Sequence, residues 1–418
     1  MRRIIAGIGS ILICLSLTSR LILRDTGTSH IPEDSAETEA FTGVPGLNIP
    51  SVEGNADPDM PEAQKPQTDD PYLGVDISFL AAGDNLIHPN IYMDAEKRGT
   101  AEKEYDFLPV YSDVIPYIQA ADFAFINQET VMAGEQYGYS GWPNFNCPQQ
   151  LGLDLVEVGF DIVGIANNHM LDKGTQALSD TMDFWHEQPV VLSGAYYNPE
   201  DAANIRIVEQ VGVKIAFLSY TYGTNGISKR ADSPIVIPYI DDNLILSDLA
   251  AAKEVSDFII VSIHWGDEYA SNPNDEQKRL AKLIADNGAD VILGHHSHSL
   301  QPITWLDGEK GKVLCIYSLG NFISGMSYPI NMVGGMLTFH ITSDGEGGLC
   351  ASDPLLIPTV FYYNMHWFDT HLYLLEDYTD LIGTSHGVQI KGNTLTEAQA
   401  RKLVTDVIDS EFLPDYLK

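Results

Sequence analysis

The stretch Asp290-Val-Ile-Leu-Gly-His-His-Ser-His298 decides how the chain is interpreted. Valine and isoleucine favour a buried, pleated strand, and the glycine lets backbone and ligands approach closely where the strand ends. Imidazole is the commonest biological metal ligand, so this histidine cluster predicts a metal site. Because side chains alternate in an extended segment, His296 and His298 are expected on one side and His295 on the other. Taken alone, the cluster also fits a surface loop that binds nothing.

Composition limits the kinds of partner. The chain has 418 residues, 44% of them hydrophobic, which is enough for two average domains or for one large α/β domain with additions. It carries 23 lysines and arginines against 58 aspartates and glutamates, a net charge of −35. This balance argues against nucleic acid or an anionic membrane surface as a bulk electrostatic partner. A bound metal would still create a local positive field.

The first 72 residues read as an export signal and a linker. Residues 1–24 begin with Arg2-Arg3 and continue as an apolar run, which predicts a signal peptide or an N-terminal membrane anchor. Arg20 interrupts that run before the ~20 residues that span a bilayer, and no good cleavage site follows it. Residues 25–72 are acidic and Pro-rich, which is typical of a disordered tether. We therefore expect an extracytoplasmic protein, anchored to the cell membrane or secreted after cleavage.

Strand and helix patterns alternate through residues 73–335. Strands are predicted at 75–82, 123–126, 162–166, 258–263, 291–294 and 313–319, and helices at 91–98, 108–120, 151–158, 176–186, 243–255 and 276–287. This order indicates an α/β fold with a parallel or mixed sheet flanked by helices. Residues 336–418, with further strands and a helix near 396–410, are expected to be a C-terminal extension packed on the same domain.

Polar side chains follow one predicted strand after another. They are Asp84, Glu129, Asn168, His169, His264, His296 and His298. Carboxyl ends of strands are where ligands bind in open α/β sheets, so we expect one shared site. Carboxylate, amide and imidazole ligands together suit Zn, Mn or Fe better than Ca or Mg, and their number fits two ions bridged by a carboxylate.

Each of these residues also has an ordinary structural explanation. Asp84 follows a glycine and could be a turn or cap residue, and Glu129 could begin a helix. Asn168 and His169 could belong to a turn before the next helix, and a single buried histidine such as His264 is more often a satisfied core residue. The coincidence at every strand end favours a site.

The motifs resemble those of the CapA-type poly-γ-glutamate capsule-synthesis family, whose fold is similar to that of calcineurin-like metallophosphoesterases. The resemblance covers residues 74–330 and rests on motifs that occur in the family's order. They are Ala82-Gly-Asp84, Asn127-Gln-Glu-Thr130, Ala166-Asn-Asn-His169 with Asp172 and Gly174, Ser262-Ile-His-Trp-Gly-Asp-Glu-Tyr269, Gly294-His-His-Ser-His298 and Tyr317-Ser-Leu-Gly-Asn-Phe322.

The resemblance implies a four-layer α/β/β/α sandwich with a centre of one or two divalent ions. It implies that His169 is the general acid or oxyanion stabiliser and that Asp172 orients it. The implied metal ligands are Asp84, Glu129, Asn168, His264, His296 and His298. Two positions depart from the phosphoesterase pattern. Glu129 stands where a bridging aspartate is usual, and Leu86 stands where the Asp-x-His motif has its histidine, the nearest histidine being His88.

The function expected from the resemblance is exported capsule synthesis or polymer handling, with a metal-dependent hydrolase-like site. The expected partners are an anionic capsule or envelope polymer and other membrane-bound capsule-synthesis components. Two alternatives stay open at this point. One is a true extracytoplasmic metallophosphoesterase, against which the missing histidine of the first motif counts. The other is a non-catalytic scaffold that keeps a vestigial site.

Overall fold

The computed structural model describes residues 70–418, and the chain enters the fold through the long strand β1 (Asp76–Leu86). Predictions for residues 1–69, the signal or anchor and most of the tether, lie outside the described residues. Within residues 70–418, no helix is both long and apolar enough to cross a bilayer.

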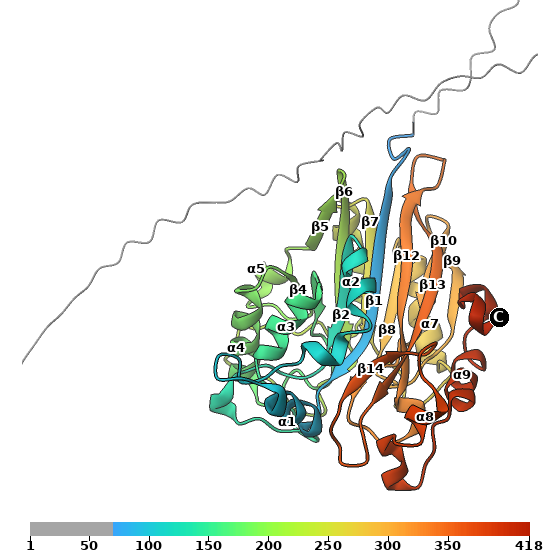
Figure 1. The fold of residues 1–418 in the computed structure, drawn as a ribbon. Helices are drawn as coiled ribbons and strands as arrows, with labels where there is room; N and C mark the ends of the chain where they lie inside the picture. The colour runs from blue at the N-terminus through green and yellow to red at the C-terminus, as the bar shows by residue number, and fades with distance from the viewer. Residues whose placement is uncertain (1–69) are drawn as a thin grey trace, which may run out of the picture. The chain divides into compact units, whose positions relative to one another are not determined.

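β1 is central to the first of two mixed sheets (Figure 1). On one side it is followed by the parallel strands β2 (Phe123–Gln128), β3 (Ile162–Gly164) and β4 (Val191–Ser193). On the other side lie the antiparallel strands β12 (Val333–Ser343), β13 (Leu349–Tyr362) and β14 (His371–Leu374), while the short β11 (Asn321–Ser324) pairs in parallel with the end of β1. Residues after 335 thus extend the same sheet.

The second sheet has six strands in the order β5-β6-β7-β8-β10-β9. Its parallel centre consists of β6 (Val213–Thr221), β7 (Phe258–His264), β8 (Val291–His295) and β10 (Lys312–Ile316). The edges are the antiparallel β5 (Arg206–Gln210) and β9 (Ile303–Asp307). Ligands in α/β sheets bind at the carboxyl ends of the parallel strands. Both sheets therefore have strand ends at which a ligand can bind.

Alternate side chains of the second sheet face different layers. On β7, Phe258 and Ile260 belong to the core shared with the first sheet. Ile259 and Val261 pack instead under α6 (Asp242–Lys253) and α7 (Asp275–Ala285). A strand buried on both faces has no polar alternation, which is why this segment reads as a continuous apolar run.

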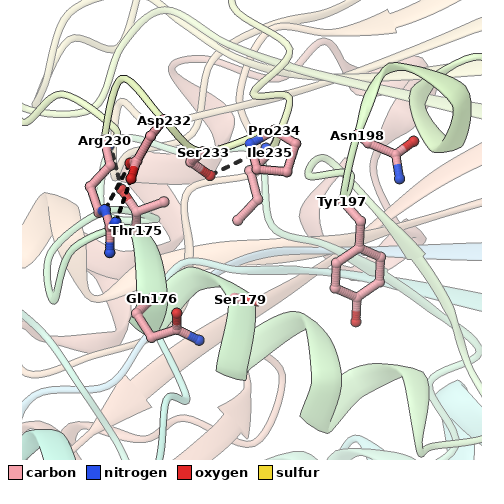
Figure 2. Close-up of a pocket in the computed structure, with 10 residues that line it drawn as sticks. All are labelled: Thr175, Gln176, Ser179, Tyr197, Asn198, Arg230, Asp232, Ser233, Pro234 and Ile235. Carbon is pink, nitrogen blue, oxygen red and sulfur yellow. Dashed lines mark hydrogen bonds and ion pairs between the residues drawn. The ribbon is translucent and has the colours of Figure 1, made fainter.

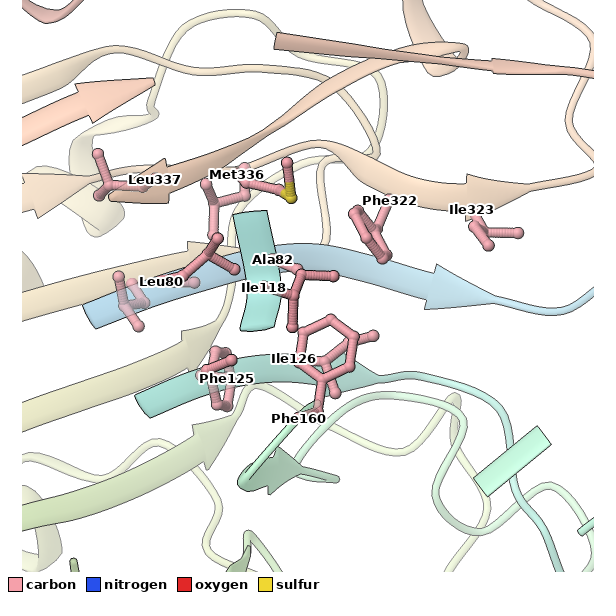
Figure 3. Close-up of a cluster of buried hydrophobic side chains, with 14 of the residues drawn as sticks. Leu80, Ala82, Ile118, Phe125, Ile126, Phe160, Phe322, Ile323, Met336 and Leu337 are labelled. Carbon is pink, nitrogen blue, oxygen red and sulfur yellow. The ribbon is translucent and has the colours of Figure 1, made fainter. Parts of the chain in front are cut away.

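Apolar side chains fill the space between the two sheets and the space between the first sheet and its helices. Phe125 of β2 meets Phe217 of β6 with ring centroids 4.8 Å apart, joining the sheets. Figure 3 shows Phe125, Ile126, Ile118 and Phe160 around β1. The helices that pack with the first sheet include α1 (Pro89–Arg98), α2 (Ile115–Ala120), α3 (Gln150–Val158), α4 (Thr175–His186) and α9 (Glu397–Thr405). The predicted four-layer α/β/β/α sandwich with mixed sheets is confirmed.

Several predicted boundaries were wrong. The helix expected over 108–120 is two pieces, a 3₁₀ turn at Leu108–Tyr111 and α2. Pro116 in the first turn of α2 lacks an N–H for a continuous helix, and it restricts the residue before it. The strand expected over 313–319 ends at Ile316, and the last helix ends at Thr405 rather than near 410. Strands β9, β11 and β14 were not predicted, because short edge strands leave weak patterns.

We expect the C-terminal extension to lose stability in mild acid because of His386. Its ring is fully buried, with Nε2 3.0 Å from the carbonyl oxygen of Phe361 and Nδ1 accepting the N–H of Val388 at 3.1 Å. Burial lowers the pKa of His386 to about 4, although the Phe361 carbonyl opposes the shift. The histidine pKa of the unfolded chain is about 6.5. Between about pH 4 and pH 6.5 the unfolded chain therefore binds more protons than the folded chain.

Stability should therefore be fully present above about pH 6.5 and fall as the pH drops toward 4, by up to about 3 kcal/mol from this residue. Urea unfolding of the wild-type protein and of His386→Gln across this range measures it. Glutamine offers a donor and an acceptor but does not titrate, so the variant should show a shallower pH dependence. If the free energy of unfolding depends on pH in the same way in both proteins, His386 is not the residue responsible for the loss of stability in acid.

Candidate metal centre

The predicted site residues of both sheets meet at the carboxyl ends of their strands. Asp84 lies near the end of β1 and Glu129 directly follows β2, while His264 ends β7. His296 and His298 follow β8. Asp84, Glu129, Asn168, His169, Asp172, His264, His296 and His298 are all buried, none more than 7% exposed. The structure thus brings every predicted site residue to one end of the sandwich.

One group of lone-pair atoms converges on His264. Its Nε2 lies 2.9 Å from Asn168 Oδ1, 3.1 Å from His296 Nδ1 and 3.6 Å from Glu129 Oε1. Two ligands of one tetrahedral zinc ion, each about 2.0–2.1 Å from the metal, lie roughly 3.3 Å apart. A single nitrogen can carry only one proton and cannot satisfy three acceptors at once. The carboxylate, amide oxygen and two imidazoles therefore fit a divalent cation better than a hydrogen-bond network.

A second group shares Glu129 with the first. Asp84, Glu129 and His298 can present ligand atoms that all lie within 4.8 Å of one another. His298 Nδ1 lies 3.2 Å from Asp84 Oδ2 and 3.0 Å from Asn321 Oδ1, while Nε2 lies 3.8 Å from Glu129 Oε1. Glu129 thus occupies the bridging position between two candidate cation sites.

Burial and the neighbouring charges shift the pKa values of the titratable groups at this end. Burial raises the pKa of Glu129 well above its usual range, against the pull of His298, and the charge of Asp84 raises it further. Burial would also raise the pKa of Asp84, but close contacts with the His295 and His298 rings hold it well below normal. Burial lowers the pKa of His298, yet Glu129 and Asp84 more than offset this and raise it to about 9. Burial lowers the pKa of His296 to about 3.

Glu129 provides the most direct test of the fit. Both of its carboxylate oxygens are buried, and neither has a hydrogen-bond partner among the described residues. Leaving a carboxylate buried without a partner costs several kcal/mol, so such groups are normally paired or coordinate a metal. His264 Nδ1 and Asp172 Oδ1 are also buried and unpartnered. The residues present fit a divalent metal ion, and they do not by themselves identify which metal binds.

The histidine turn differs from the prediction. β8 ends at His295, and His296 and His298 have φ values of 92° and 53°, so they lie in a turn rather than in an extended segment. Left-handed backbone at such residues is uncommon and clusters at functional sites. His295 also does not point away from the site as predicted. Its Nδ1 lies 3.4 Å from Asp84 Oδ1, and its ring packs on Phe125.

The position of Asp84 depends on the close approach of the backbone at Gly83 to the backbone at Gly320. A Cβ on Gly83 would lie 2.1 Å from the carbonyl oxygen of Gly320, which also accepts the N–H of Asp84 at 2.9 Å. The carboxylate accepts hydrogen bonds from the Asn127 side chain at 2.8 Å and from the His296 N–H at 3.2 Å. The last bond ties the two sheets together at the site.

His169 and Asp172 form a separate buried dyad beside the centre. His169 Nδ1 lies 2.8 Å from Asp172 Oδ2, which also accepts the N–H of Phe145 at 2.7 Å. The edge of the His169 ring meets Phe145, with centroids 4.8 Å apart. Asp172 therefore fixes the ring orientation and leaves Nε2 as the atom available for proton transfer.

The segment after β6 connects the centre to a neighbouring cavity. Tyr222 lies against His296 with ring centroids 4.5 Å apart, and Asn225 Oδ1 accepts from Asn168 Nδ2 at 3.3 Å. Further along, the N–H of Arg230 donates to Thr175 Oγ1 at the start of α4, at 2.8 Å. This segment, α4 and the loop carrying Tyr197 line a cavity of about 420 Å³. Figure 2 shows its lining residues.

Sequence reasoning did not single out three residues of the site. Asn321 accepts from His298 Nδ1, and Tyr222 covers His296 while its side chain is 46% exposed. Glu268, in the loop after β7, can place a carboxylate oxygen within 4.8 Å of ligand atoms of His296 and His298. Asn321 and Glu268 both lie in quoted motifs just after strands, so their positions carried a signal. Tyr222 follows β6 without any motif.

We expect Glu129→Gln to separate stability from metal binding. Removing the buried charge should leave the metal-free protein at least as stable as the wild type, because an unpartnered carboxylate is lost. At a Mn²⁺ or Zn²⁺ concentration about 100 times Kd, the wild type should gain about 2.7 kcal/mol, and the variant much less. Calorimetric melting with and without metal measures both effects.

The matched control is Glu254→Gln, an exposed glutamate at the end of α6. It should keep the full metal-induced rise in Tm. A Glu129→Gln protein with the same rise as the wild type would remove Glu129 from the ligand set.

Two curated bacterial proteins resemble the chain in sequence. The PGA biosynthesis protein CapA of Bacillus subtilis is 34% identical over 195 residues, which cover 46% of this chain and 50% of that protein. The capsule biosynthesis protein CapA of Bacillus anthracis is 29% identical over 245 residues, 56% of this chain and 58% of that protein. The chain thus spans between half and three-fifths of the length of these relatives.

A solved structure and a protein family also match. The 5'-nucleotidase precursor of Thermus thermophilus superposes with a TM-score of 0.42 and 15% identity, covering 67% of this chain and 54% of that one. The family described as bacterial capsule synthesis protein PGA_cap matches residues 78–326, the region that carries Asp84, Glu129, His264 and the histidine turn. Because this match covers more than half of the 418 residues, the chain belongs to the bacterial capsule synthesis protein PGA_cap family.

Proposed function

We propose that this protein is an exported capsule-synthesis protein that handles or hydrolyses an anionic polymer at a metal-dependent site. The observation that carries the proposal is the buried, unpartnered Glu129 carboxylate between two groups of ligand atoms. The names of its relatives, PGA biosynthesis protein CapA and capsule biosynthesis protein CapA, support capsule polymer as the substrate class. Export rests on the basic and apolar character of residues 1–24.

The chain's own residues define what the site can do. Glu129, Asn168, His264 and His296 would hold one cation, and Asp84, Glu129 and His298 a second. Cations bound there would polarise a carbonyl or phosphoryl oxygen and lower the pKa of water. His169, oriented by Asp172, would deliver a proton to the leaving group through Nε2. Tyr222 and Tyr269, both about half exposed, lie beside the rings of His296 and His298, with centroids 4.5 and 6.3 Å apart.

A polyanion needs positive charge in a chain whose net charge is −35. The cations at the centre would supply it, because a bound ion is usually the largest local charge. In the neighbouring cavity, Arg230 is the one basic residue among those that line it, and it pairs with Asp232 through Nε–Oδ1 and Nη2–Oδ2 contacts of 3.0 and 2.6 Å (Figure 2). We propose that the polymer extends from the centre along this segment.

Turnover by the metal-loaded full-length protein tests the proposed activity. With Mn²⁺ or Zn²⁺ bound, it should shorten poly-γ-glutamate, and Asp84→Asn should abolish this. His169→Gln should lower the rate about 10²–10⁴-fold, because general acid catalysis is lost. Chromatography of the polymer measures chain length, and Glu254→Gln serves as the control.

Two other results would overturn the hydrolytic part of the proposal. Hydrolysis of a generic phosphodiester with intact polymer, abolished by Asp84→Asn and by His296→Ala, would identify a phosphoesterase. Bound metal without turnover of either substrate would identify a non-catalytic scaffold.

Polymer binding should respond oppositely to changes in the Arg230–Asp232 pair. Asp232→Ala frees the guanidinium and should strengthen binding of poly-γ-glutamate several-fold at low salt, whereas Arg230→Ala should weaken it. High salt should shrink both effects, since exposed charges are screened. Titration calorimetry measures the affinity. The control is Arg279→Ala, which removes an exposed arginine that pairs with Asp242 on the outer helix layer. Unchanged affinity in Arg230→Ala would exclude the cavity as the polymer path.

A further inference from the structure

The second cation position is one ligand short within its buried shell. Asp84, Glu129 and His298 supply three ligand atoms, so a four-coordinate ion would have one position left for another side chain or for water. The first motif has Leu86 where the phosphoesterases have a histidine, and this side chain has no donor atom. His88 does not replace it. Its Nδ1 accepts the N–H of Gly325 at 3.1 Å, and it belongs to none of the ligand groups in the described residues.

Glu268 forms a separate group of ligand atoms with His296 and His298, next to the group of Asp84, Glu129 and His298. Its carboxylate can come within 4.8 Å of ligand atoms of both His296 and His298. His298 is therefore shared by two groups, one with the buried carboxylates Asp84 and Glu129 and one with Glu268. The side chain of Glu268 is exposed, and none of the lysines or arginines of residues 70–418 forms an ion pair with it. A cation beside His298 would have Glu268 as its solvent-side neighbour.

The backbone around Glu268 fixes it to the histidine turn. The N–H of Tyr269 donates to the carbonyl of Ser297, between His296 and His298, at 2.7 Å. Gly266 has a φ of 88°, and a Cβ there would lie 2.5 Å from the Gln277 side chain, so this bend requires glycine. The loop and the turn are thus held in register, and Glu268 faces the histidines as a consequence.

A solvated surface carboxylate is the ordinary alternative. It fits this position poorly, because the negative charge of Glu268 acts on the buried Glu129 and raises its pKa further. Like charges so close to one another destabilise the site unless a cation lies between them. A bound metal ion would offset the repulsion between these carboxylates.

We propose that Glu268 is the solvent-side ligand of the second cation, in place of the histidine absent from the first motif. This inference rests on the proposed metal-dependent function. It makes the two positions unequal. The first has two imidazoles, an amide and a shared carboxylate, which suit Zn²⁺, whereas the second has three carboxylates and one imidazole, which suit Mn²⁺. The first ion should bind more tightly, because its ligands are all buried and preorganised.

The test is metal stoichiometry, which does not depend on any substrate. Full-length protein is loaded with one equivalent of Zn²⁺ and then titrated with Mn²⁺, and bound Mn²⁺ is followed by EPR. The wild type should take up one further equivalent. Glu268→Gln should keep the first ion and lose at least about tenfold in Mn²⁺ affinity, in line with the loss of a group that tunes a metal site. Glu268→Asp should recover part of that affinity.

Controls separate this inference from the proposed function. Glu254→Gln should bind both ions as the wild type does, and Asp84→Asn should lose the second. The metal-free Glu268→Gln protein should melt at or slightly above the wild-type temperature, because the residue is exposed and one of the like charges is removed. A wild-type protein that binds no metal would overturn the proposed function itself. A wild-type protein that binds only one ion, or a Glu268→Gln variant with unchanged affinity for the second, would overturn the role of Glu268 alone.

Discussion

The burial of two carboxylates at the junction of two sheets is the constraint on which this structure depends. Asp84 and Glu129 are completely removed from water, and an isolated buried carboxylate is among the costliest groups a fold can contain. Asp84 is compensated by the Asn127 amide, the His296 N–H and the His298 ring. Neither carboxylate oxygen of Glu129 has a hydrogen-bond partner among the described residues, and the imidazole nitrogens of His264 and His298 lie 3.6 and 3.8 Å from Oε1. A cation is the simplest group that satisfies it, and the centre is built around that requirement.

The sandwich architecture supplies the rigidity that this arrangement needs. Phe125 and Phe217 join the sheets in the core, and the His296–Asp84 hydrogen bond joins them at the site. Metal ligands on strand ends can be held more precisely than ligands on free loops, because the strands cannot move independently. The exceptions are the histidine turn and the Glu268 loop, and a backbone hydrogen bond from Tyr269 to Ser297 connects these two.

The proposed handling of an anionic polymer by a strongly acidic chain of the capsule synthesis family requires positive charge that acts locally. The net charge of −35 acts over the whole surface, where salt screens it. A buried cation acts at short range in a region of low dielectric constant, where its field is stronger. Polymer recognition confined to the centre and to the Arg230 cavity would be specific, because the remaining surface repels the same ligand.

The sequence by itself determined the fold class and the set of strand-end residues. Apolar runs such as Val291-Ile-Leu293 are intrinsically buried strands, and polar residues that follow them must lie at one edge of a parallel sheet. Asp84, Glu129, Asn168, His264, His296 and His298 were therefore predictable as neighbours. The broken helix at Pro116 was also legible in principle, since proline acts locally.

Only the tertiary structure decided which atoms face one another. The left-handed backbone of His296 and His298, and the approach of His295 to Asp84, depend on how the two sheets meet. Glu268 became a candidate ligand because a hydrogen bond brings its loop to a turn almost thirty residues later in the chain. Local preferences determine strands and turns, whereas ligand geometry depends on long-range packing, and no single stretch of sequence encodes that packing.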